Sequence, residues 1–236
     1  MSSSIFIGLA VVIAFAAFVQ GAIGVGFALI VGPVLALTYP ELLPGGLLLL
    51  MLPLNAFVAW RERAALDWNG SGWITAGRVA GTFLGLWVLI AVALSTLNML
   101  VGAATLLAAL ASMFAPAFTP NRGAFATAGV VTGITETATG IGGPPLALVY
   151  QHHAAASQRA NVALCFLLGE VLSLALLAAA GRISVTQTEV AALLLPAVVV
   201  GGLSSRLAHA GLDQRRLRLF VLGFAVVSGI VLIVRG

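Results

Sequence analysis

Residues 135–145 read TETATGIGGPP, and this stretch interrupts a long apolar segment with a carboxylate, three glycines and two adjacent prolines. Gly-Ile-Gly-Gly allows the chain to turn sharply. A proline pair suits the first turn of a helix, where missing N–H groups cost little. The sequence therefore predicts one helix that ends before the glycines and a second helix that begins at the prolines.

The composition around this stretch is typical of a membrane protein. The 236 residues are 61% hydrophobic and only 8% charged, whereas a soluble domain carries about 25% charged residues. Apolar runs of membrane-spanning length recur along the whole chain, which predicts an all-α polytopic membrane protein. The net charge of +4 comes from arginines at the ends of apolar runs, so it indicates membrane orientation and not nucleic-acid binding.

Two of the apolar segments are too long or too interrupted for one straight span. A helix over residues 4–39 would reach about 54 Å, against a hydrocarbon core of about 30 Å. It is interrupted by QGAIGVG (20–26), and the segment 124–150 is interrupted by TGIGGPP (139–145). Each is either one kinked span or a hairpin that returns to its starting side. The other segments run roughly 44–60, 72–94, 97–118, 161–180, 188–205 and 217–234.

The arginines favour the hairpins. Single crossings would divide ten arginines five against five, with no bias. Returning hairpins gather eight of them on one side, namely Arg61, Arg63, Arg122, Arg159, Arg206, Arg215, Arg216 and Arg218, and leave Arg182 and Arg235 on the other. This bias fits the positive-inside rule. It predicts cytoplasmic arginine-rich loops and periplasmic termini, with Arg78 added to the cytoplasmic group.

An internal repeat relates the two halves of the chain. A shift of 116 residues places VQGAIGVGF (19–27) on TETATGIGG (135–143), so that Gln20 meets Glu136. With a one-residue gap, Asn55 meets Glu170. The sequence predicts two inverted repeats, residues 1–120 and 121–236, in one membrane domain. Each is a broken (re-entrant or hairpin) helical segment followed by three transmembrane helices, a plan common among secondary transporters.

The broken segments predict an anion site. Unwound backbone at membrane depth is tolerated only inside protein or beside a water-filled cavity. A helix that begins at the prolines points its positive end and free N–H groups at the turn. The candidate substrate-binding residues at the two turns are Gly24, Gly26, Thr139, Gly140, Gly142 and Gly143. The alternative is that these glycines only let helices pack closely.

Glu136 is the candidate proton-coupling residue. It shares a helix face with Thr132, Thr139 and Gly140. A glutamate at membrane depth usually faces a cavity or a partner, and burial away from a cation favours its neutral, protonated form. We therefore expect Glu136 to carry a proton whose uptake permits anion binding. The alternative is a structural hydrogen bond across a helix interface.

Three further polar residues lie inside apolar segments. Gln20, Asn55 and Glu170 are candidate substrate-binding residues, with helix–helix hydrogen bonding as the alternative role. No compact metal-binding signature is present, and the sequence indicates no metal and no cofactor.

The glycine-rich turns also resemble a known family. QGAIGVGF (20–27) and TGIGGPPL (139–146) are similar to the motifs of the TauE/SafE sulfite exporter family, and RERAALDW (61–68) against GRISVTQ (181–187) is a weaker match. Phe27 and Pro144 stand where these motifs often have a third glycine. The resemblance covers nearly the whole chain.

The resemblance implies a secondary transporter of the bacterial inner membrane. Its substrate would be a small anion such as sulfite, thiosulfate or a short organosulfonate, and its other contacts would be membrane lipid; a homo-oligomer is left open. A passive anion channel would use the same turns without a proton. An intramembrane enzyme would use Glu136 and Glu170 as an acid–base pair, but no nucleophile or metal cluster accompanies them. We therefore expect no enzymatic activity.

Overall fold

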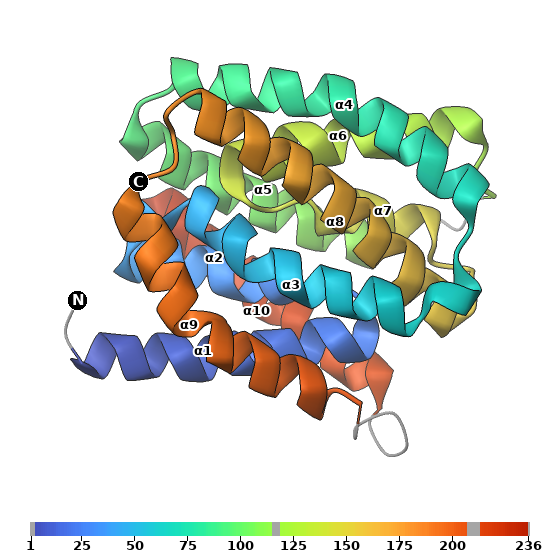
Figure 1. Ribbon diagram of the computed structural model, residues 1–236, viewed down its shortest axis with the longest axis horizontal. Helices are drawn as coiled ribbons and strands as arrows, with labels where there is room; N and C mark the ends of the chain where they lie inside the picture. Colours follow the sequence, from blue (N-terminus) through green and yellow to red (C-terminus); the bar gives the residue numbers. More distant parts are fainter. Residues whose placement is uncertain (1–2, 115–118, 207–212, 236) are drawn as a thin grey trace.

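The protein is a bundle of helices that run side by side along one direction (Figure 1). The computed structural model describes residues 3–114, 119–206 and 213–235, and these residues form ten α-helices and no strand. The all-α prediction is confirmed. Five helices are long and apolar enough to cross a membrane: α1 (Ser3–Ile23), α4 (Trp68–Ala91), α8 (Ala155–Ala179), α9 (Val185–Ser204) and α10 (Gln214–Arg235).

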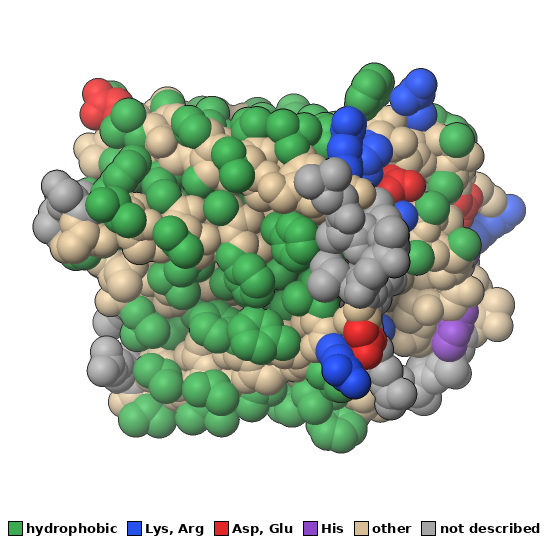
Figure 2. All heavy atoms as spheres, turned by 90° about the horizontal axis from the view of Figure 1, so that it is seen from below, with side chains coloured by type: hydrophobic (Ala, Val, Ile, Leu, Met, Phe, Trp, Pro, Cys, Tyr) green, Lys and Arg blue, Asp and Glu red, His purple; other side chains and the backbone are tan. Residues whose placement is uncertain are grey.

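The outer surface of the bundle matches a lipid environment. Large apolar side chains are exposed on the flanks, including Trp87 at 69% and Val234 at 79% of their surface. Figure 2 shows one flank covered by hydrophobic side chains, with most of its charged side chains gathered toward one end. Since such a surface would be unfavourable in water, the chain is a membrane protein.

The first interrupted segment is a hairpin. α1 ends at Ile23, α2 (Phe27–Thr38) follows after three residues, and the two helices pack against each other. The turn contains Gly24 with φ 87° and Gly26 with φ 126°, a backbone region that side chains other than glycine seldom adopt. The hairpin alternative is therefore the observed one, and glycine is required at its turn.

The second interrupted segment follows the same plan. α6 (Arg122–Thr139) ends at Gly140, which is left-handed with φ 80° and caps the helix by donating its N–H to the Glu136 carbonyl at 2.7 Å. α7 (Gly143–Val149) begins directly after Gly142 and carries the prolines in its first turn. The break predicted from TGIGGPP is confirmed. At seven residues, α7 is much shorter than its counterpart α2.

The remaining helices complete each half. In the first half α3 (Gly45–Arg61) precedes α4 along the chain and α5 (Leu94–Phe114) follows it, and short 3₁₀ turns at Pro40–Leu42 and Arg63–Ala65 join α2 to α3 and α3 to α4. In the second half α8, α9 and α10 follow α7. The contacts between helices repeat when the halves are exchanged: α4 packs on α6 as α9 packs on α1, and α3 packs on α9 as α8 packs on α4.

The closest helix contacts repeat at matched positions. A Cβ at Gly81 of α4 would overlap the Val130 carbonyl of α6, and a Cβ at Gly201 of α9 would overlap the Ala14 carbonyl of α1. Val130 and Ala14 are related by the 116-residue shift that aligns the halves. Both contacts need glycine because the two backbones touch.

The two hairpins begin at opposite ends of the bundle. At one end, Arg61 donates to the Gly21 carbonyl near the end of α1 at 2.7 Å, and Arg122 at the start of α6 stacks over Trp73 near the start of α4. Both chain termini lie at the other end (Figure 1). The end of α1 and the start of α6 therefore lie together, so the two hairpins run in opposite directions.

Candidate functional site

A buried ion pair lies between α4 and α6. Nη2 of Arg78 is 2.8 Å from Oε2 of Glu136, and the two side chains are 1% and 0% exposed. Arg78 also donates from Nη1 to the Cys165 carbonyl of α8 at 2.8 Å. One cation thus joins three helices in the interior. The interpretation of Arg78 as a topology signal at a membrane surface was wrong, because the residue lies ten positions inside α4.

Glycines make the space that the guanidinium occupies. A Cβ added to Gly169 of α8 would overlap the Arg78 guanidinium directly. A Cβ at Gly133 of α6 would lie 2.8 Å from the Arg78 carbonyl, so the α4 and α6 backbones are also in close contact. The ion pair therefore sits where three helices approach more closely than larger residues would permit.

The ion pair leaves polar atoms without hydrogen bonds. Nε of Arg78 and Oε1 of Glu136 are buried and have no hydrogen-bond partner among the described residues. Buried polar groups are normally paired, and a buried ion pair compensates its desolvation only with good additional hydrogen bonds. The ion pair could therefore make further hydrogen bonds, because one guanidinium N–H donor and one carboxylate acceptor are unused in the closed interior.

The second glycine turn packs against this ion pair. A Cβ at Gly142 would lie 2.7 Å from Oε2 of Glu136, and Thr132 donates its hydroxyl to the Gly142 carbonyl at 3.1 Å. Thr139 accepts a hydrogen bond from the Ile141 N–H at 3.2 Å. Of the predicted residues at this turn, Gly142 lies against the Glu136 carboxylate, while Gly140 packs on Leu47 and Gly143 on Phe166. Whether Thr139, Gly140, Gly142 and Gly143 contact a substrate stays a prediction.

A separate chain of hydrogen bonds contains the three other polar candidates. The Phe27 N–H at the start of α2 donates to Oε1 of Gln20 at 3.1 Å, Nε2 of Gln20 donates to Oδ1 of Asn55 at 3.0 Å, and Nδ2 of Asn55 donates to Oε1 of Glu170 at 2.6 Å. All three side chains are at most 2% exposed. The structure thus brings together residues 115 positions apart, as the repeat alignment pairs them.

A comparison with protein families now decides the assignment. The chain matches the family described as sulfite exporter TauE/SafE over residues 9–232. The chain belongs to this family. The resemblance drawn from the glycine motifs is confirmed, and the TauE/SafE chain is accordingly a membrane protein of a transporter family associated with sulfur-containing anions. No match was found among curated proteins or among solved structures.

In this TauE/SafE chain the first turn has a donor that is already engaged. The Gln20 side chain accepts a hydrogen bond from the Phe27 N–H, the first N–H of α2, at 3.1 Å. Gly24 lies against Arg159, and Gly26 lies against Val19. In the second half the matched position holds Glu136, which pairs with Arg78 instead. The same place in each hairpin is thus neutral in one half and charged in the other.

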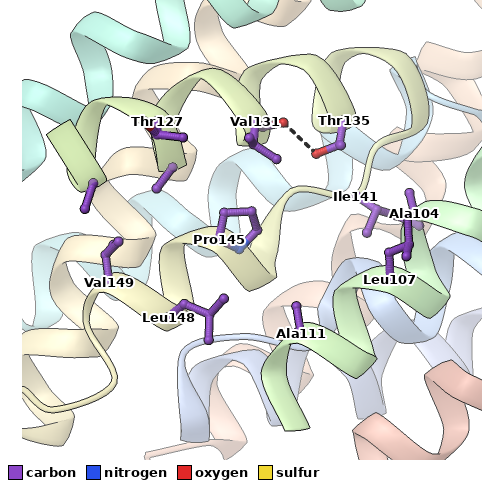
Figure 3. Close-up of a pocket in the computed structure, with 12 residues that line it drawn as sticks. Ala104, Leu107, Ala111, Thr127, Val131, Thr135, Ile141, Pro145, Leu148 and Val149 are labelled. Carbon is purple, nitrogen blue, oxygen red and sulfur yellow. Dashed lines mark hydrogen bonds between the residues drawn. The ribbon is translucent and has the colours of Figure 1, made fainter. Parts of the chain in front are cut away.

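A cavity of about 530 Å³ lies on the lipid-facing side of α5, α6 and α7. Figure 3 shows Thr135, Ile141 and Pro145 at its wall. The Thr135 hydroxyl donates to the Val131 carbonyl of its own helix at 3.0 Å (Figure 3). No charged side chain lines the cavity. It is therefore unsuited to a small hydrophilic anion, and the ion pair is the better candidate.

A second charged cluster lies at the end of the bundle near the first turn. Oε1 of Glu62 is 3.1 Å from Nη2 of Arg61 and 3.0 Å from Nη2 of Arg159, and these side chains are 9–15% exposed. Arg61 also donates to the Ser205 hydroxyl at 3.1 Å. The cluster thus joins α1, α3, α8 and the end of α9, in addition to the role in orientation predicted for its arginines.

Sequence reasoning missed Arg78 and Gly169. One signal was available: Arg78 is followed by Gly81 and Gly85 at helical spacing, which marks a face that packs closely on another helix. An arginine on such a face is directed into protein and not toward a membrane surface. The expectation that Glu136 lies away from a cation was also wrong, because Arg78 on this face of α4 pairs with it.

Proposed function

We propose that the protein is a secondary transporter of a small sulfur-containing anion, such as sulfite, thiosulfate or a short organosulfonate, in the bacterial inner membrane. The observation that carries the proposal is the buried guanidinium of Arg78. A cation held inside a membrane protein is costly and usually marks a substrate or ion pathway. Membership of the TauE/SafE family supports the anion class.

Glu136 occupies the guanidinium when no substrate is bound. An arriving oxyanion presents negatively charged oxygens to Arg78, as the Glu136 carboxylate does. Arginine can bind two oxygens of such a group in a bidentate manner. Once the anion holds Arg78, the Glu136 carboxylate has lost its cation, and a proton taken up from water neutralises it. The net charge of the site is zero before binding, and it is zero again after a monovalent anion and one proton have bound.

The remaining predicted residues fit around this exchange. Gly142 lies against Glu136, so its backbone N–H and that of the adjacent Gly143 can donate to the anion when the carboxylate moves aside. Thr139 and Gly140 hold the turn in shape. Gln20, Gly24, Gly26 and Asn55 line the equivalent region of the first half, where Glu170 of the second half meets Asn55. We place substrate contacts at both turns in the open states.

The repeat supplies the two access states. Residues 1–120 and 121–236 form inverted repeats, and the opposite directions of the hairpins together with the matched glycine contacts support this arrangement. An inverted pair lets one half adopt the conformation of the other, which exposes a central site to each side in turn. The arginine-rich end faces the cytoplasm and both termini face the periplasm, in keeping with the positive-inside rule.

Uptake by proteoliposomes tests the proposal. Purified protein is reconstituted and assayed with sulfite, thiosulfate, a short organosulfonate, sulfate and acetate. We expect saturable flux of at least one sulfur-containing anion, its abolition in Arg78→Gln, and full flux in Arg182→Gln, which removes an exposed arginine outside the site. Full flux in a folded Arg78→Gln variant would overturn the assignment of the substrate site.

The response to a pH gradient tests the coupling. Flux through the wild-type protein should rise when an imposed pH gradient favours proton entry with the anion, and Glu136→Gln should remove this response. Anion flux that ignores the pH gradient in the wild-type protein would instead indicate a passive channel that uses the same arginine.

A further inference from the structure

The chain of hydrogen bonds that runs from Phe27 through Gln20 and Asn55 to Glu170 has a donor-to-acceptor direction that the backbone fixes. A backbone N–H can only donate, so the bond from Phe27 requires that the Gln20 oxygen accepts it. The Gln20 amide nitrogen must then donate to Asn55, and the Asn55 nitrogen must donate to Glu170. Oε1 of Glu170 is therefore an acceptor, and any proton on this carboxyl group sits on Oε2.

Oε2 of Glu170 lies in a closed, unpartnered position. The side chain is 0% exposed, and Oε2 has no hydrogen-bond partner among the described residues. The carboxyl group thus receives one hydrogen bond, from a neutral amide. An ionised carboxylate in such a place would be left with most of its desolvation cost uncompensated.

The elements packed on α8 offer Glu170 no cation of its own. Arg78 of α4 is directed to Glu136 of α6 at 2.8 Å, so these two charges cancel. Near Glu170, α1 and α3 contribute only the amides of Gln20 and Asn55, and α7 has no ionisable side chain. The other buried ionisable residues of α8 are Cys165 and, at the arginine-rich end, Arg159. The remaining charged residues on or beside these elements lie toward the ends of the bundle: Arg61, Glu62, Arg63, Asp67, Arg122 and Arg159 at the arginine-rich end, and Arg182 at the other end.

We propose that Glu170 is a proton-binding site: its Oε2 carries a proton in this closed conformation, and the proton is exchanged with water when the pathway opens. The step breaks the O–H bond of the carboxyl group and leaves the electron pair on Oε2. The resulting carboxylate is tolerated only when water reaches it. Closure of the interior therefore requires that a proton returns to the same oxygen.

This site is distinct from Glu136. Glu136 is paired with Arg78 in this structure and takes up a proton only when an anion replaces it at the guanidinium. Glu170 takes up its proton on closure, with or without substrate. Protonation of Glu170 in the closed state does not depend on the proposed transport. Its exchange in each cycle rests on the proposed function. Because the proton is bound in both the loaded and the empty closed state, it crosses with the anion and returns with the empty protein, and the net number of protons per anion is set by Glu136.

Infrared spectroscopy of the full-length protein in lipid tests the protonation directly. The carbonyl stretch of a protonated carboxyl group is separate from the ionised form and shifts in D₂O. Of the five glutamates in the chain, only Glu136 and Glu170 are buried, so exposed carboxylates contribute nothing at neutral pH. We expect this band in the wild-type protein and its loss in Glu170→Gln, which keeps the acceptor for Asn55.

A second variant removes the dependence on one substitution. The double variant Arg78→Gln with Glu136→Gln deletes both charges of the ion pair and leaves Glu170 as the one buried glutamate. The band should persist in it. A wild-type protein without the band, a band retained in Glu170→Gln, or a band lost in the double variant would each overturn the proposal.

Transport separates this proposal from the previous one. If no anion is transported but the band behaves as described, Glu170 is a proton site and the proposed function fails alone. If transport is found, wild-type flux measured at equal pH on both sides should fall in alkaline buffer, because closure requires the proton, and this fall should be smaller in Glu170→Gln. An unchanged fall in Glu170→Gln would overturn the exchange step.

Discussion

Removal of the Arg78 side chain should be among the most damaging single changes to the stability of this protein. At 2.8 Å and an effective dielectric constant of about 20, the attraction between the two charges is about 6 kcal/mol. Breaking a buried pair by deleting one partner costs about 3–5 kcal/mol, because the other charge stays buried without compensation. We expect Arg78→Met to lower the free energy of unfolding by about 3–5 kcal/mol.

The cost should vanish when both charges are removed together. The double variant Arg78→Met with Glu136→Leu fills the same space with apolar groups, and such replacements of buried pairs are often neutral or stabilising. Its stability should therefore lie within about 1 kcal/mol of the wild-type protein, allowing for imperfect packing. Acidic buffer should also reduce the deficit of Arg78→Met, because Glu136 can then take up a proton.

Reversible unfolding by SDS in mixed micelles, followed by circular dichroism, measures these differences. The two single variants and the double variant form a double-mutant cycle that isolates the interaction between the two side chains. Costs that simply add in the double variant would show that the two groups do not interact. The ion pair would then fail as the structural basis of the site.

Three further predictions address other contacts. Gly169→Ala places a methyl group on the buried guanidinium and should cost about 1–3 kcal/mol in unfolding free energy, whereas the exposed Gly72→Ala, with open space around it, should be neutral or stabilising. Asn55→Leu leaves an unpaired amide and an unpaired carboxyl group and should lower stability by about 1–3 kcal/mol for each of them, measured in the same unfolding assay. Glu62→Gln leaves two largely buried guanidinium groups without their shared carboxylate and should lower stability by about 1–3 kcal/mol in the same assay.

The sequence was sufficient to predict features that depend on neighbouring residues. Helix ends at glycine and starts at proline are local, so both breaks could be located from the motifs alone. The choice of hairpins over kinked spans depended on the arginine distribution, and the contacts between α1 and α2 and between α6 and α7 agree with it. The 116-residue shift also paired Asn55 with Glu170, which proved to be in contact.

The contacts that define the site are not local. Arg78 and Glu136 are 58 residues apart, and Gly169 lies on a third helix. Which of several interior polar residues meet depends on the rotation of each helix about its axis, and hydropathy alone does not determine that rotation. The sequence therefore identified Glu136 and Glu170 as buried carboxyl groups but did not show that only the first has a cation.

The contact between the α4 and α6 backbones restricts how the interior can open. Two helices that touch through glycines cannot slide past each other without backbone overlap, so α4 and α6 must move as one rigid body. The backbones that carry Arg78 and Glu136 keep their separation, and only the two side chains rearrange when an anion binds. Arg78 also joins α4 to α8 through its hydrogen bond to the Cys165 carbonyl. This bond has to break first when the interior opens, so α8 separates there from the pair of α4 and α6.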